Sequence, residues 1–141
     1  MNDMEQLLEK ALQLEQQGEK DEALETLSRA FDLLIDEAGA YARAQVGDST
    51  DTEALRAMAP TLIEHSTVYL RKNLTAAMIL NSMGLLFTEL EQYDAAVQKF
   101  EEAVRLTPNN TEYDDPTENL QAVLMKIAEL NSPEEETALD G

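Results

Sequence analysis

Apolar residues recur every three or four positions along most of the chain, which is the spacing of one face of an α-helix. We expect a first helix that begins after Asn2, an N-cap residue with Glu5 three positions on, and ends at Gly18. Glycine accepts the left-handed backbone that follows a helix C-terminus. A second helix opens near Asp21. Because the link is so short, the two helices must fold back as an antiparallel pair.

The middle of the chain is less regular. A short helix is expected at about 36–46, either separate from the preceding helix or continuous with it. The stretch VGDST that follows has the composition of a loop. Asp51 or Thr52 then caps a helix that runs to about Lys72, where two cations would face its carbonyl end. Pro60 lies inside this helix and is expected to kink or restart it.

Three further helices are predicted at 74–90, 94–107 and 116–131. The first is apolar on more than one side, which indicates burial between several neighbours. For the last, Asp115 is expected as the N-cap and Pro116 as the first helical residue. Residues 132–141 are acidic and without periodicity, so they are expected to form a disordered tail. The pattern as a whole predicts an all-α protein.

One stretch, MGLLFTELEQYDAAVQKFEEAVRLTP, places small and aromatic residues at intervals that a single amphipathic helix does not require. It resembles a tetratricopeptide repeat, a hairpin of two helices with a characteristic signature. Small residues in the signature allow the two helices to cross closely, and a proline ends the unit. The matching residues are Leu80, Met83, Gly84 and Phe87 in the first helix, and Ala96, Phe100, Ala103 and Pro108 in the second.

The first 35 residues resemble the same unit more weakly. Ala23 takes the place of Ala96, so the two copies are offset by 96 − 23 = 73 positions. Two periods of about 34 residues give about 68, and we assign the remaining residues, about five, to the VGDST loop. The expected organisation is one domain over 1–131, with units at about 4–37, 38–76 (degenerate) and 77–110 and a capping helix at 116–131.

The resemblance implies hairpins stacked as a short right-handed superhelix, whose concave face holds a peptide or helix of a protein partner. Carried over by position, the partner-binding residues are Glu5, Leu8, Leu12, Glu15, Tyr41, Gln45, Met78, Asn81, Leu85 and Thr88. The alternative is that the apolar members belong to the core, covered by the terminal helix or by a second copy. Chaperone-binding members of the family grip a carboxylate with Lys, Arg and Asn. Only Asn81 fits that pattern, so such a clamp is not expected.

Charge narrows the class of partner. The chain has 29 Asp and Glu against 10 Lys and Arg, for a net charge of −19. Such a chain repels nucleic acids and anionic membranes, so we expect neither as a partner, whereas a basic protein surface would be attracted. The alternative is that the acidic residues only keep the protein soluble and do not attract a basic partner. The absence of cysteine fits a reducing compartment. No signal peptide or long apolar run is apparent, so a cytoplasmic location is expected.

Catalytic chemistry is sparse in this sequence. His65 is the one histidine, and phosphotransfer through it is an alternative without a supporting motif. No calcium loop, phosphate loop or nucleotide fingerprint occurs, so no enzyme activity, cofactor or metal is expected. We therefore expect an interaction module, such as an adaptor or a chaperone-like assembly factor. The main alternative is a self-associating acidic structural protein, for which a homodimer is possible, or a charge-based mimic.

Overall fold

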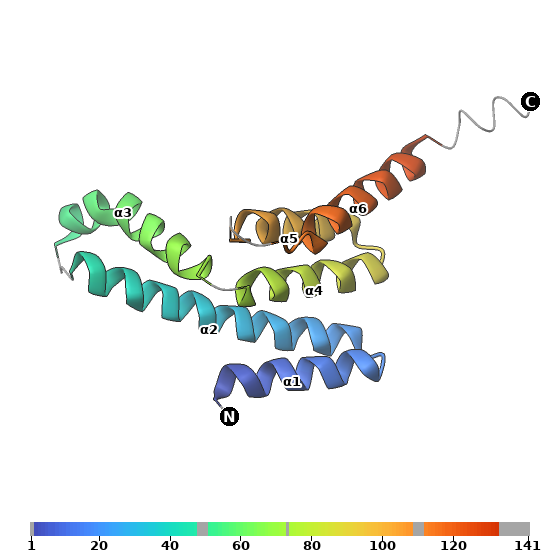
Figure 1. Cartoon of the computed structure of the whole chain (residues 1–141), viewed down its shortest axis with the longest axis horizontal. Coiled ribbons are helices and arrows are strands. Elements are labelled where there is room, and N and C mark those ends of the chain that lie inside the picture. The colour runs from blue at the N-terminus through green and yellow to red at the C-terminus, as the bar shows by residue number, and fades with distance from the viewer. Residues whose placement is uncertain (1, 48–50, 73, 109–111, 133–141) are drawn as a thin grey trace, which may run out of the picture.

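The computed structural model describes residues 2–47, 51–72, 74–108 and 112–132, and this part of the chain is entirely helical and loop. Its six helices are α1 (Asp3–Gln16), α2 (Lys20–Val46), α3 (Thr52–Leu70), α4 (Thr75–Glu89), α5 (Tyr93–Arg105) and α6 (Asp115–Asn131). Figure 1 shows α1 and α2, then α4 and α5, as neighbouring antiparallel hairpins, with α3 folded back over the far end of α2. The predicted all-α fold of helical hairpins is confirmed.

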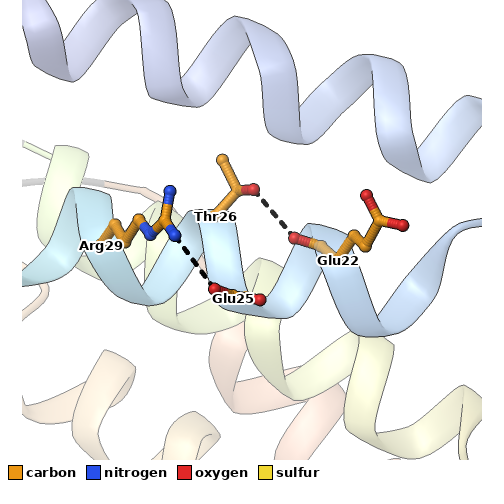
Figure 2. Close-up of polar contacts among 4 residues, drawn as sticks. All are labelled: Glu22, Glu25, Thr26 and Arg29. Carbon is orange, nitrogen blue, oxygen red and sulfur yellow. Dashed lines mark hydrogen bonds and ion pairs between the residues drawn. The ribbon is translucent and has the colours of Figure 1, made fainter.

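The first hairpin forms where the sequence predicts it. The Asn2 side chain accepts a hydrogen bond from the Glu5 backbone amide at 2.7 Å, which caps α1. Gly18 has φ +80°, the left-handed conformation expected after a helix C-terminus. Thr26 is buried between the helices. Its hydroxyl donates a hydrogen bond to the Glu22 carbonyl at 2.8 Å (Figure 2), so the buried hydroxyl group has a hydrogen-bond partner within α2.

Helix α2 is a single helix of 27 residues. The short helix expected at 36–46 is therefore continuous with the one before, and the unit boundary expected near residue 38 falls inside α2. At 1.5 Å per residue this helix is about 40 Å long. Its first half pairs with α1 and its second half pairs with α3, while α4 packs against it as well. Ala38 and Ala42 keep the second half close to α3 because they are small and fully buried.

Helix α3 is capped by Asp51, whose side chain accepts from the Glu53 amide at 3.2 Å. It continues through Pro60 without restarting and ends at Leu70, two residues earlier than expected. Of the two cations expected at this end, Arg71 is the C-cap residue of α3, but its side chain bonds another helix. Arg71 Nε donates to the carbonyl of Arg105 at 2.8 Å, so its side chain caps α5, which lies close to the end of α3. Loop positions 48–50, where extra residues are expected from the repeat offset, lie outside the described residues.

The second hairpin, formed by α4 and α5, has a close helix crossing at Gly84. A Cβ atom added to Gly84 would overlap the Phe100 ring, at a distance from Cε1 that real Cβ atoms essentially never show. Phe100 is 1% exposed, and Ala96 and Ala103 beside it are fully buried. Only glycine on α4 therefore leaves room for the Phe100 ring of α5. This is the physical reason for the glycine–phenylalanine pair in the sequence signature.

Helix α6 closes the open side of α5 and also touches α4. It begins at Asp115, with Asp114 in the N-cap position and no side-chain cap, so the prediction of Asp115 as N-cap is wrong by one residue. Proline is tolerated throughout the first turn, because the N–H groups there have no helical hydrogen-bond partner. The position of Pro116 therefore does not show which residue begins the helix. The acidic tail predicted at 132–141 falls, apart from Ser132, outside the described residues.

Candidate functional site: the α1–α4 groove

A groove runs between α1 and α4, the first helices of the two hairpins, and consists of two adjacent cavities. The larger, of about 370 Å³, is lined by Leu8, Ala11, Leu12, Glu15, Leu27, Thr75, Met78, Ile79 and Ser82. The smaller, of about 270 Å³, is lined by Asn2, Met4, Glu5, Leu8, Leu34, Glu37, Tyr69, Leu70, Thr75 and Ala76. Because Leu8 and Thr75 line both cavities, we treat the two as one site, the α1–α4 groove.

The helical period explains why this surface is apolar. On α1, Ala11 and Leu14 are buried in the core. Leu8 and Leu12 lie on the adjacent side of the same helix, because of the helical period, and they line the groove. On α4, Ile79 is buried while the adjacent Met78 faces outward. Leu12 is 55% exposed and Met78 is 50% exposed. Two large apolar side chains that are half exposed on opposite walls are a surface suited to an apolar ligand.

Carboxylates stand at both ends of the groove. At one end, partial burial and then the nearby Glu89 raise the pKa of Glu15 above its ordinary value. Lys20 lies 3.5 Å from Glu89, but on an exposed part of the surface. A cation placed beside Glu15 would relieve both causes of this shift, because it replaces lost solvation and offsets the negative neighbour.

At the other end, Tyr69 donates its hydroxyl hydrogen to Oε2 of Glu37 at 3.1 Å. Loss of solvation, followed by this hydrogen bond to a carboxylate, raises the pKa of Tyr69. Glu5 lines the same cavity and is exposed. The groove thus has an apolar middle and negative charge at each end.

Half of the predicted binding residues line this groove: Glu5, Leu8, Leu12, Glu15 and Met78. Thr75, Ile79 and Ser82 line it as well and were not predicted, although they continue the helical spacing around Met78. Two more unpredicted residues, Glu37 and Tyr69, come from α2 and α3. No local pattern signals that the fold brings these two to α1.

The other five predicted residues lie elsewhere. Asn81 is 6% exposed, and its Oδ1 accepts a hydrogen bond from Asn119 of α6 at 2.9 Å. Tyr41 packs against Tyr69 with ring centroids 5.2 Å apart. The rest line neither cavity: Gln45 is exposed near the end of α2, Leu85 is exposed on α4, and the Thr88 hydroxyl donates to the Gly84 carbonyl.

Other chemistry is limited in the part of the chain that the structure describes. No group of three or more His, Cys, Asp or Glu side chains is arranged there to hold a metal ion. His65 lies half-buried on α3. Within the same residues, no helix is both long enough and apolar enough to span a membrane.

Comparison with known proteins agrees with the hairpin geometry. Residues 77–110, which contain most of α4, all of α5 and the Gly84–Phe100 crossing, match the model of a family described as tetratricopeptide repeat. No curated protein matches the chain. Tetratricopeptide repeats are in general protein–protein interaction modules and are typically non-catalytic. The chain is thus a small all-α protein of helical hairpins, and its residues 77–110 match the tetratricopeptide-repeat family.

Proposed function

We propose that this protein is a non-catalytic interaction module, an adaptor or assembly factor, that binds a segment of a protein partner in the α1–α4 groove. The observation that carries the proposal is the pair of half-exposed side chains, Leu12 and Met78, on facing walls of that groove. Burying such side chains against a ligand is favourable by about 25 cal/mol per Å² of apolar surface removed from water. A ligand of matching shape therefore has a source of affinity here.

The charges suggest what flanks the apolar part of that ligand. Glu15 with Glu89 at one end, and Glu5 with Glu37 at the other, would attract Lys or Arg. The partner segment we propose has apolar residues in its centre and basic residues on either side. The net charge of −19 would steer a basic segment toward the protein before contact.

The test is capture of the partner from extracts of the source cell by the intact protein and by two matched variants. Met78→Lys places a charge in the groove, whereas Met125→Lys makes the same change on α6, where Met125 is 66% exposed and outside the groove. Both positions are solvent-accessible, so both variants should fold. We expect the protein and Met125→Lys to retain the same partner at high salt, and Met78→Lys to lose it.

A second comparison separates apolar from purely electrostatic binding. Exposed charge–charge attraction weakens as salt is added, because the Debye length falls from about 30 Å at 0.01 M to about 3 Å at 1 M. An apolar groove contact should persist through that change. Retention of the partner by Met78→Lys, or its complete release from the unaltered protein by salt, would contradict the proposal.

A further inference from the structure

The outer face of α3 is a second exposed apolar surface, and it is separate from the groove. We define it by exposed residues of α3 that do not line the cavity between α2 and α3: Arg56, Ala57, Pro60, Ile63, Glu64 and Val68. Ile63 is 66% exposed and Val68 is 51% exposed. We propose that this face is the interface of a homodimer, with α3 of one copy packed antiparallel against α3 of the second.

The packing of α3 shows which side is unpartnered. Its inner side meets α2, where Leu55, Met58, Leu62 and Ser66 face Gly39, Ala42 and Arg43. The Ser66 hydroxyl donates to the Ala38 carbonyl at 3.4 Å. Within the described ranges, α2 is the one helix with which α3 shares an extensive contact, and Leu70 is the one buried residue of α3. The opposite side, turned away from α2, lies on the exterior (Figure 1).

Charge identifies a second copy as the occupant. A contact between two copies brings together two chains of net charge −19, so it is least costly where the surface is nearly neutral. The charged residues of α3 are Glu53, Glu64 and Arg56, whereas α1 has four acidic residues and one lysine. The outer face of α3 therefore carries less negative charge than the α1–α4 groove, and a second copy is repelled less strongly there.

The register of the charges is self-complementary. In a two-fold contact, residue i of one copy meets residue j of the other and j meets i. In an antiparallel pairing centred on Pro60, each residue faces the residue of the second copy for which the two residue numbers add up to 120. Arg56 then faces Glu64 of the second copy, and the same pair forms again on the other side of the axis. Ala57 faces Ile63 in this register, a small residue opposite a large one.

Among the residues that the structure describes, neither Arg56 nor Glu64 has an oppositely charged partner in its own copy. Arg56 and Glu64 are eight residues apart on the helix, or about 12 Å along its axis, too far to pair with each other. Both side chains are exposed, and neither takes part in an ion pair among the residues that the structure describes. The homodimer would provide each of them with an oppositely charged partner.

The experiment is sedimentation equilibrium of the full chain over a wide concentration range at physiological ionic strength. The monomer has a mass of 15.7 kDa, and we expect the unaltered protein to reach twice that mass. Ile63→Lys should raise the dimer dissociation constant at least tenfold, because it buries a charge at the contact. Met125→Lys on α6 is the matched control and should leave that constant unchanged. Circular dichroism confirms that each variant folds.

The charge pair provides the sharper test. Arg56→Glu should weaken the dimer at least tenfold, because it sets like charges opposite each other twice. Combining it with Glu64→Arg restores opposite charges in the same register and should return the dissociation constant to within about threefold of the original. A chain that is monomeric at every concentration would overturn the proposal. So would a dimer that Ile63→Lys leaves intact, or a charge swap that fails to restore association.

The two proposals can fail separately. Met78→Lys lies in the groove and should not change the mass of the protein in solution. If instead the chain stays monomeric and Ile63→Lys abolishes capture of a different protein, the outer face of α3 belongs to a heterologous contact, and the homodimer is rejected.

Discussion

Gly84 and Phe100 pack so closely that the size of the residue at position 84 is constrained. The phenylalanine ring occupies the volume that any side chain at position 84 would fill, and the ring is itself buried. This contact could be predicted from the sequence alone, because small and aromatic residues at that spacing are the signature of closely crossed helices.

We expect Gly84→Ala to lower the free energy of unfolding by about 1–3 kcal/mol, the usual cost of overpacking a well-filled core. The added methyl group would overlap the buried ring of Phe100, so either the ring or the backbone of α4 must shift. Urea denaturation monitored by circular dichroism would measure the change.

Gly39 is the matched control for this substitution. It lies inside α2, and an added Cβ would meet only the end of the flexible Arg43 side chain, at 3.4 Å. Gly39→Ala should therefore raise the free energy of unfolding by about 0.5–1 kcal/mol, since alanine loses less conformational freedom in a helix. If both substitutions stabilise the protein, the close crossing at Gly84 does not exist in solution.

Asn81 shows what residue-level patterns miss. Its position in the repeat predicts a groove residue, but the side chain is buried against α6 and bonded to Asn119. This face of α4 is covered by α6, whose Asn119 comes 38 residues after Asn81 in the sequence. No local spacing contains that information.

At the scale of elements, α6 is held in place by this polar pair as well as by Val123. Asn119→Ala removes the donor to Asn81, and we expect it to lower the free energy of unfolding by about 1–2 kcal/mol, because a buried amide oxygen loses its partner. Thermal denaturation of Asn119→Ala, Asn81→Ala and the double variant would measure this cost and the coupling between the two.

In that cycle the double variant should cost less than the sum of the single variants, with a coupling of about 0.5–3 kcal/mol for residues in direct contact. Asn131→Ala is a control on the same helix, since Asn131 is exposed at its end. Strict additivity would indicate that α6 does not dock on α4 through these side chains.

The helices themselves are largely predictable from the sequence. The contacts between helices, and whether two helical segments are continuous, are not. Periodicity and caps locate α1 and α3 to within about two residues, because those signals are local. Local spacing places Arg71 at the end of its own helix, yet it bonds the carbonyl of Arg105, 34 residues away. The continuity of α2 is not decided by the sequence, since no glycine or proline at residue 36 forces a break and no local signal excludes one.

For the whole molecule, net charge is the property that the sequence specifies most directly. Two ion pairs are found among the described residues, Lys20–Glu89 and Arg29–Glu25, and both are exposed. Exposed pairs of this kind contribute little to stability. Most acidic side chains therefore repel one another without local compensation, and this repulsion opposes the compact state.

Salt should consequently stabilise the protein. Raising sodium chloride from about 0.01 M to about 0.3 M shortens the range of repulsion. We expect the melting temperature to rise by about 3–5 °C, on the order of 1 kcal/mol for a chain of this size. The effect should shrink as the pH is lowered toward the sequence pI of about 4.1, where the net charge vanishes. A melting temperature that falls with salt at neutral pH would contradict this account.

The length of α2 has a further consequence, for the way such a protein can change over evolutionary time. Arrays of repeats gain or lose whole units readily, because each unit contacts only its neighbours. Here α2 (residues 20–46) packs against both α1 and α3 and also supports α4. A duplication or deletion cut inside α2 would leave α1 or α3 without the helix against which it packs. The number of hairpins on the N-terminal side of α4 is therefore fixed by a single shared helix.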